Sequence, residues 1–478
     1  MSIIKLFYRN PSAPQKASSE TGIDFCTGSL LKKILIFSFP LIITNVLQLL
    51  FNATAMIIVG QFNGDQALAA VGSTSSLVSL LVSIFNGISV GAGVIAANYF
   101  GARNKDAVSK TVHTSIIMSV FLGILLLFTG QFFSRQILIL MNSPANVIDL
   151  STLYLRCYFY CMPAFMVYNF GSALIRASGD SRHPLYYLTF CGLVNVLLSF
   201  LFVGAFRLSV AGAGLATVIS QYISAFLIIN RLRNDQSCFQ LTWKKLHFSS
   251  RYGYEIFKVG VPIGLRSVAM PVSNVLIQSS INSFGAVVIA GNSAAVSLEN
   301  MIYAILESIQ QTLITVTSQN YGAGKYGRII HAFHICMVYV SIAALFLGIT
   351  VNIYSIPLLH FYTSGEEALA VGILRLRLVN LPYILCGLME VSGAVLSGTG
   401  HSLPPMIISV IGVSGLRILW VLTFFQIHPS LESLYLSYPI SWGVTFIGQY
   451  ICFRILWKKI VKKLKLMLDS LSVTRFIP

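Results

Sequence analysis

Apolar residues recur along this chain in long stretches that are separated by short polar segments. Most stretches hold about 20 residues, the length that an α-helix needs to cross a hydrocarbon core of roughly 30 Å. Runs such as SVFLGILLLFTGQFF and YVSIAALFLGITVNIY are apolar on every face, whereas strands of a membrane barrel alternate apolar and polar residues. The pattern therefore predicts an all-α polytopic membrane protein.

About twelve transmembrane helices are expected from these stretches. In chain order they cover about residues 31–54, 68–98, 109–133, 151–175, 184–206, 210–232, 253–277, 288–318, 329–353, 370–396, 403–425 and 433–457. Composition agrees with this prediction, because 55% of the 478 residues are hydrophobic and 10% are charged. An ordinary soluble domain carries about 25% charged residues.

The basic residues predict the orientation of the chain. Lys and Arg gather in the N-terminal tail, after every second span and at the C-terminal end, while the opposite loops carry acids such as Asp65 and Glu366. By the positive-inside rule, both termini lie in the cytoplasm, and we expect the cell inner (plasma) membrane as the location. The net charge of +17 stands beside helix ends, so the expected partners are membrane lipids and not nucleic acid.

Two segments of the chain are repeated in its second half. ALIRASGDSRHPLYY returns as AVLSGTGHSLPPMII, which aligns Gly179 with Gly400 and Pro184 with Pro405. NYFGARNKD likewise returns as NYGAGKYGR. A duplication on this scale predicts two six-helix bundles that are related by pseudo-symmetry and enclose a central cleft.

The expected organisation has five parts. Residues 1–30 form a cytoplasmic N-terminal tail, residues 31–233 the N-terminal six-helix lobe, and residues 234–252 a cytoplasmic linker. Residues 253–457 form the C-terminal six-helix lobe, and residues 458–478 a basic cytoplasmic tail. The first thirty residues lack the features of a signal peptide, so we expect a mostly disordered tail there.

Several of these stretches together resemble one transporter family. FPLIITNVLQLLFNATAMIIVGQFNGDQALAAVG, ANYFGARNKD, ALIRASGDSRHP, VPIGLRS, SQNYGAGK and LSGTGHSLPP, in this order, are similar to bacterial multidrug and toxic compound extrusion (MATE) transporters over roughly residues 30–457. The resemblance implies twelve helices in two bundles and export of bulky, often cationic organic compounds. It also implies exchange for protons or sodium, with no other cofactor and no enzymatic activity.

Two positions depart from the pattern of that family. Many relatives carry an aspartate in the first helix where this chain has Ala55, and an aspartate four residues after the asparagine that corresponds to Asn195. Here Ser199 stands at the second place. The N-terminal lobe therefore lacks both carboxylates that the resemblance would assign to a cation site there.

Acidic residues within the predicted spans are confined to the second half of the chain: Glu299, Glu307 and Glu390. A carboxylate inside a membrane is costly, so each is a candidate for cation coupling. Desolvation raises the pKa of a carboxyl group toward neutral pH, so that it can bind and release a proton. When it is ionised, the same group can bind sodium or a cationic substrate. The alternative is a structural role, and for Glu390 a buried ion pair with Arg417.

Steps of four residues join Glu299 and Glu307 of the eighth span into a polar stripe that also contains Tyr303, Gln311, Thr315 and Gln319. Such a stripe can border an aqueous cleft, while the opposite face packs or contacts lipid. We predict that substrate binds polar side chains of several spans: Asn45, Gln48, Asn52, Asn169, Asn195, Tyr303, Gln311 and Arg417. For the amides, hydrogen bonding between helices is the alternative. No metal site and no catalytic residue is predicted.

The leading interpretation is a secondary active multidrug exporter, which exchanges protons or sodium for organic, cationic substrates by alternating access. Its expected partners are small organic molecules and the coupling ion, and it is expected to act as a monomer. A lipid-linked oligosaccharide flippase is the alternative, although such a protein would need more basic residues inside its cleft. An uncoupled transporter remains a further alternative because of Ala55 and Ser199. A membrane transferase would need clustered His or Asp motifs, which the sequence does not contain.

Overall fold

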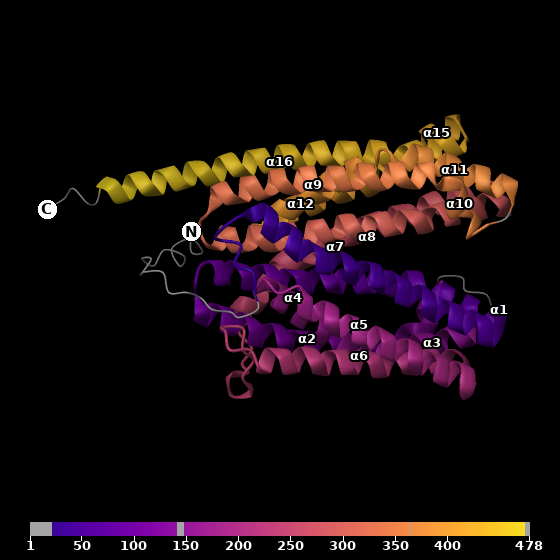
Figure 1. The fold of residues 1–478 in the computed structure, drawn as a ribbon, viewed down its shortest axis with the longest axis horizontal. Helices are drawn as coiled ribbons and strands as arrows, with labels where there is room; N and C mark the ends of the chain where they lie inside the picture. The colour runs from indigo at the N-terminus through magenta and orange to yellow at the C-terminus, as the bar shows by residue number, and fades with distance from the viewer. Residues whose placement is uncertain (1–21, 141–147, 364, 474–478) are drawn as a thin grey trace. The chain divides into compact units, whose positions relative to one another are not determined.

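The computed structural model of the chain describes residues 22–140, 148–363 and 365–473. Residues 1–21 of the predicted N-terminal tail and residues 474–478 of the predicted basic tail lie outside this part. Every regular element in the described residues is a helix (Figure 1). The prediction of an all-α fold is therefore confirmed.

The first half of the chain holds α1 (Leu30–Gly101), α2 (Lys105–Leu140), α3 (Ile148–Tyr160), α4 (Met162–Ala177), α5 (Arg182–Ser199), the π-helical η2 (Phe200–Ala205) and α6 (Ser209–Arg233). A short 3₁₀ turn, η3 (Trp243–Lys245), lies in the connection that follows. α1 contains two apolar segments that are each long enough to span a membrane, Leu30–Phe62 and Val78–Gly101.

The second half holds α7 (Ser250–Asn282), α8 (Ala286–Gly322), α9 (Tyr326–Ile353), α10 (Ser355–His360), α11 (Glu366–Asn380), α12 (Tyr383–Gly398), α13 (Leu403–Ser409), the π-helical η4 (Val410–Gly415), α14 (Leu416–Leu422), α15 (Phe424–Ile427) and α16 (Leu431–Val473). α11 and α12 meet at a bend of 45° and together make one broken span.

By length and composition, eight described segments can cross a membrane, and the α11–α12 pair makes up to nine. The predicted spans outside this set are those at about residues 151–175, 288–318 and 433–457. The first is divided between α3 and α4, where Pro163 opens the second helix. The other two lie in α8 and α16, whose polar side chains lower the mean hydropathy. Polarity within a span is therefore concentrated in particular helices.

The chain divides into two compact units. Unit 1 comprises Met1–Val268, Tyr303–Ile335 and Gly398–Gly400, and unit 2 comprises Ala269–Ile302, Cys336–Ser397 and His401–Pro478. α7 and α8 each continue from one unit into the other. The predicted boundaries of the two six-helix lobes stay a prediction.

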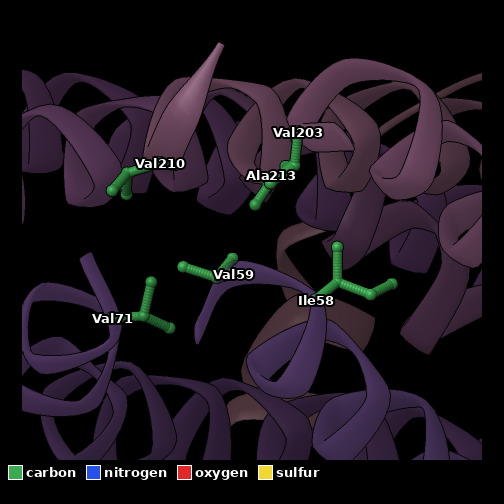
Figure 2. Close-up of a cluster of buried hydrophobic side chains, with 6 residues drawn as sticks. All are labelled: Ile58, Val59, Val71, Val203, Val210 and Ala213. Atoms are coloured by element: carbon green, nitrogen blue, oxygen red, sulfur yellow. The ribbon is translucent and has the colours of Figure 1, made fainter. Parts of the chain in front are cut away.

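Unit 1 is organised around α4, which packs against α1, α2 and α6. Lipid tails are as apolar as these side chains, so the helices of a membrane protein associate through van der Waals packing and interhelical hydrogen bonds. Figure 2 shows one such buried cluster, which joins α1, η2 and α6 through Ile58, Val59, Val71, Val203, Val210 and Ala213. A second buried cluster lies in unit 2 and joins α8, α10 and α11 through Ala294, Ala295, Leu298, Leu359 and Leu376.

α1 and α7 approach one another within unit 1 at positions where both carry glycine. A Cβ atom on Gly87 would lie 2.1 Å from the backbone nitrogen of Gly264, and one on Gly91 would lie 2.5 Å from Cα of Gly260. Only glycine fits such a contact. The spacing of small residues in GISVGAG, from Gly87 to Gly91, thus provides close helix packing.

The turns that the sequence repeats also share a backbone conformation. Gly179 has φ 92° and Gly400 has φ 82°, both in the left-handed region that favours glycine. Each glycine follows the end of a helix, α4 in the first half and α12 in the second. The repeat therefore extends from sequence to local structure.

Residues 22–29 form an N-terminal strap that packs within unit 1. The amide of Ile23 donates to the carbonyl of Gly179 at 3.0 Å, and the amide of Phe25 donates to Oε1 of Gln319 at 3.1 Å. Arg328 donates from Nη2 to the carbonyl of Phe25 at 2.8 Å. The Phe25 side chain is fully buried. The strap thus joins the turn after α4 to the end of α8 and the start of α9.

Cys26 belongs to the same strap. Burial, with the negative charge of Asp24, raises the pKa of the Cys26 thiol to about 12. The thiol therefore stays protonated at neutral pH and can donate to the carbonyl of Gln319, with Sγ at 3.5 Å from the oxygen. Residues 22–29 thus differ from the mostly disordered tail that the sequence predicts, because Phe25 supplies a buried apolar anchor.

Candidate functional site

The middle of the polar stripe of α8 lies as the four-residue spacing predicts, whereas its end residues Glu299 and Gln319 are buried. Within unit 1, Tyr303, Glu307, Gln311 and Thr315 are all partly exposed. Residues of the other face are buried: Leu306, Ile309 and Leu313 are each 0% exposed. Gln311 donates from Nε2 to Oε1 of Glu307 at 3.3 Å. The apolar face thus anchors α8 and leaves one row of polar side chains partly accessible.

A small cavity adjoins this stripe. Its lining comes from three helices of unit 1 and comprises Val90, Gly93, Val94, Ala173, Arg176, Ala177, Gln311, Ile314, Thr315 and Ser318. Its volume of about 30 Å³ is sufficient for a water molecule. Pockets for drug-sized ligands are larger, at roughly 300–1,000 Å³. The cavity can therefore hydrate the stripe but cannot hold bulky cargo.

Arg176 is the charged residue of the cavity wall. It lies at the end of α4 and close enough to Glu307 for the two charges to interact. The sequence assigned Arg176 to a cytoplasmic loop. Arg176 follows directly after the apolar run of α4. This position indicates that its side chain can face protein, because the end of α4 packs against α8.

Glu299, on the part of α8 that belongs to unit 2, has a different environment. Arg375 of α11 donates from Nε and Nη2 to the two carboxylate oxygens, each at 2.8 Å. Glu299 is 5% exposed and Arg375 is 2% exposed. A bidentate arginine contact favours the ionised carboxylate and occupies both of its oxygens. Glu299 is thereby held in a buried ion pair.

The remaining contacts of Arg375 complete a buried polar cluster in unit 2. Its Nη1 donates to Oδ1 of Asn292 at 2.8 Å, and Tyr435 donates to the same oxygen at 3.4 Å. The guanidinium carbon lies 5.3 Å from the ring centre of Tyr435 and 4.9 Å from that of Tyr438. Each of the three guanidinium nitrogens thus has an acceptor.

Sequence reasoning missed Arg375, although the residue lies inside the predicted span at about residues 370–396. The available signal was the same as for the glutamates, because a basic residue within an apolar helix requires a partner. The pairing with Glu299 joins helices that are distant in the sequence. Periodicity along a single helix does not report such a contact.

Arg417 of α14 is 1% exposed and belongs to unit 2. Its Nε donates to the hydroxyl of Ser441 at 2.9 Å, and its Nη1 donates to the hydroxyl of Ser273 at 3.1 Å and to Oδ1 of Asn274 at 2.9 Å. These acceptors are neutral. Glu390, the partner that the sequence suggested for Arg417, is buried in α12 with 7% exposure.

The amides predicted on the first span have two kinds of environment. Asn45 donates from Nδ2 to the carbonyl of Ala304 at 3.3 Å and to the hydroxyl of Ser308 at 3.0 Å, and so joins α1 to α8 within unit 1. Gln48 and Asn52 are exposed. Asn45 is therefore placed beside the polar stripe, whereas the other two are not brought to it by any hydrogen bond described.

Two further amides bond within unit 1. Asn169 donates to the carbonyl of Phe165, one turn earlier in α4, at 2.8 Å. Asn195 of α5 donates to the hydroxyl of Ser220 in α6 at 3.2 Å. Both contacts match the alternative in which amides join neighbouring helical groups. The roles of these residues in substrate binding stay predictions.

The two positions that depart from the family pattern also lie in unit 1. Ala55 is partly exposed on α1, and Ser199 is 1% exposed at the end of α5. The π-helical η2 begins directly after Ser199. Among the described residues, no three His, Cys, Asp or Glu side chains gather in a way that could hold a metal ion.

Comparison with known proteins places this arrangement in context. The MatE family model matches residues 40–201 and, a second time, residues 262–423. The double match coincides with the internal repeat. Together the two matched segments cover more than half of the chain.

Bacterial proteins are similar to the chain over most of its length. The probable multidrug resistance protein YoeA of Bacillus subtilis is 27% identical over 441 residues, which are 90% of this chain and 95% of that protein. The probable multidrug resistance protein NorM of Thermotoga maritima is 22% identical and aligns with 80% of this chain and 83% of its own length.

Solved structures share the fold. A multidrug resistance MATE family transporter of the MOP superfamily, solved in an outward-facing conformation, has a TM-score of 0.87 and 19% identity, and covers 94% of this chain and 100% of its own. A MATE in complex with MaL6 has a TM-score of 0.86 and 20% identity, and covers 92% of this chain and 99% of its own.

Proposed function

Because this chain belongs to the MatE family, we propose that it is a secondary active exporter, which moves organic molecules out of the cell in exchange for protons or sodium. The names of its bacterial relatives, multidrug resistance proteins, support export of several compounds. They do not favour the flippase alternative. The membrane is the site of action, with both termini in the cytoplasm by the positive-inside rule.

The observation that carries the proposal is the partly exposed carboxylate of Glu307 on the polar face of α8. It faces the polar side of α8, accepts a hydrogen bond from Gln311 and lies near a cavity that can hydrate it. Such a group can bind a proton or sodium ion in one state and a cationic group of the cargo in the other. Glu307 is therefore the principal coupling residue of the proposal.

Competition for one carboxylate provides the coupling. When the cargo occupies Glu307, the coupling ion is excluded, and when the ion binds, the cargo is released, so each weakens the binding of the other. Alternating access then requires the binding site to open to one side of the membrane in the first state and to the other side in the second. Glu390 is the second coupling candidate. The pairing of Glu299 with Arg375 favours a positioning role for Glu299.

The polar side chains beside Glu307 provide candidate contacts for cargo. Tyr303 and Gln311 are partly exposed on the same face of α8, and Asn45 bonds to the neighbouring turn of that helix. An aromatic ring and two amides can orient an organic molecule without a strict shape requirement. This combination suits transport of several compounds.

Transport by the purified chain in proteoliposomes tests the proposal. We expect accumulation of a fluorescent organic cation to be driven by an imposed pH or sodium gradient, and to collapse when the effective gradient is dissipated. Glu307→Gln is expected to abolish the gradient dependence, whereas the control Glu366→Gln, which changes an exposed acid at the start of α11, should keep it. Equal transport with and without each gradient would contradict coupling and favour the alternative of an uncoupled transporter.

A further inference from the structure

Unit 2 buries two guanidinium groups against one tyrosine. The guanidinium carbon of Arg417 lies 4.3 Å from the ring centre of Tyr438, and that of Arg375 lies 4.9 Å from the same centre. Both arginines are nearly inaccessible to solvent. Two positive charges against one ring repel each other. The role of each arginine therefore depends on the groups that accept hydrogen bonds from it and compensate its charge.

Arg375 is compensated fully. Both carboxylate oxygens of Glu299 and the side-chain oxygen of Asn292 accept hydrogen bonds from its three nitrogens. A planar guanidinium that meets a carboxylate in this way leaves little capacity for another ligand. Arg375 is therefore an arginine whose nitrogens all have acceptors, and Arg417 can be compared with it.

Arg417 is not compensated in the same way. Its described hydrogen bonds go to two serine hydroxyls and one asparagine carbonyl, and these acceptors carry no net charge. Its Nη2 is buried and has no hydrogen-bond partner among the described residues. A buried N–H group without an acceptor is destabilising, and more so when it carries charge. The Nη2 of Arg417 is thus an open position for an acceptor.

Aromatic side chains surround this position. Trp442 lies 5.7 Å from the guanidinium carbon of Arg417, measured to the ring centre. Its ring is in edge contact with Tyr438 at 5.8 Å and with Tyr383 at 5.0 Å. Two aromatic rings beside one cation, with a third packed on Trp442, favour a ligand with a flat apolar body and a single anionic group.

The backbone next to Arg417 is also irregular. The π-helical η4 ends at Gly415, two residues before Arg417, and its Ser414 donates to the carbonyl of Ala269 at 2.6 Å. Single π-helical turns occur often at functional sites. Here the wider turn changes the direction of the residues that follow it, and Arg417 is among the first of these.

We propose that Arg417 forms an anion subsite in unit 2, which binds the carboxylate or sulfonate group of an aromatic organic ligand. The anionic oxygen takes the open Nη2, and the aromatic body lies against Tyr438 and Trp442. Polyphosphates do not fit the proposal, because Arg375 is already committed to Glu299. The inference rests on the proposed function in one respect only, which is that the ligand of this subsite is transported.

A probe series of constant shape tests the subsite. Binding of 1-naphthoate and 1-naphthamide to the purified full-length chain is measured by equilibrium dialysis, with empty micelles as the blank for partition. We expect naphthoate to bind at least about tenfold tighter than the amide. Similar affinities for the two probes would overturn the proposal.

Variants assign the binding to Arg417. In Arg417→Gln the preference for naphthoate is expected to disappear, and in Arg417→Lys to fall without disappearing, because the charge remains and the planar fork is lost. A naphthoate preference that persists in a folded Arg417→Gln protein would also overturn the proposal. If this variant does not fold, the Arg417→Lys protein and the probe series on the parent chain still decide.

The outcome is independent of the transport assay. Naphthoate binding without gradient-driven transport would contradict the proposed function and leave the subsite standing. Gradient-driven export of an organic cation without selective naphthoate binding would contradict the subsite alone.

Discussion

Glu299 and Glu307 are carried by the same helix and share its polar stripe, yet they have different surroundings. Glu299 is buried, and both of its oxygens are bound by Arg375 at 2.8 Å. Glu307 is partly exposed and is bonded by the amide of Gln311 near a small cavity. The first carboxylate is fixed in an ion pair, whereas the second can change its partner.

This difference separates two roles that a carboxylate can have within a membrane helix. An ion pair that is sealed from water fixes helices in one arrangement, and removal of one partner leaves an uncompensated charge. A carboxylate with access to water can exchange ligands as the protein changes state. The two glutamates therefore predict different responses to the same substitution.

The largest effect is expected for Glu299→Gln. This change removes the counter-charge of buried Arg375 and should lower the free energy of unfolding by about 3–5 kcal/mol. Thermal unfolding of the purified protein in detergent, followed by circular dichroism, measures the change. The double variant Glu299→Leu with Arg375→Met is the control, and it should recover much of the loss. A single variant as stable as the parent would show that the pair is not structural.

A smaller effect is expected at the end of the stripe that contacts the N-terminal strap. Gln319 is 0% exposed, accepts from the amide of Phe25 and donates to the carbonyl of Ala177 at 2.9 Å. Gln319→Ala should cost about 1–3 kcal/mol, because two buried backbone groups lose their partner.

Gln311→Ala is the matched control for this prediction, because Gln311 is a partly exposed amide on the same helix. Its effect on the unfolding midpoint should be clearly smaller. Faster maleimide labelling of Cys26 in the Gln319→Ala protein would locate the change in the strap. Equal midpoints for the two variants would contradict the role assigned to Gln319.

The smallest effect on stability is expected for Glu307→Gln. The side chain keeps its size and is partly exposed, so the free energy of unfolding should change by less than about 1 kcal/mol. The same thermal measurement checks this value against Glu299→Gln. A loss as large as that of Glu299→Gln would mean that both carboxylates are structural, and the comparison between them would fail.

Much of the fold follows from local pattern. Apolar stretches of span length predict the helices, and the repeated glycines predict turns, which Gly179 and Gly400 confirm with positive φ. The glycine spacing around Gly87 likewise predicts the close approach that α7 makes there. These features depend on the residue itself or on its near neighbours, so the sequence is sufficient for them.

The candidate site could be predicted only in part. The four-residue spacing correctly places Tyr303, Glu307, Gln311 and Thr315 on one partly exposed face of α8. It does not reveal that Arg375 seals Glu299 or that Arg176 faces the cavity, because those contacts join distant segments. For Arg417, the sequence suggested Glu390, and the structure gives hydrogen bonds to Ser441, Ser273 and Asn274 instead. The partner of a buried charge is a tertiary property.

The central claim is that cargo and coupling ion share Glu307. Its most direct test is the affinity of a fluorescent organic cation for the purified chain, measured across a pH range at low and at high sodium. In the parent protein, we expect the Kd to rise at least about tenfold as pH falls or as sodium increases, because protonation or sodium removes the free carboxylate. Glu307→Gln should bind weakly and without this dependence. A Glu307→Gln protein with the affinity and the ion dependence of the parent would contradict the account.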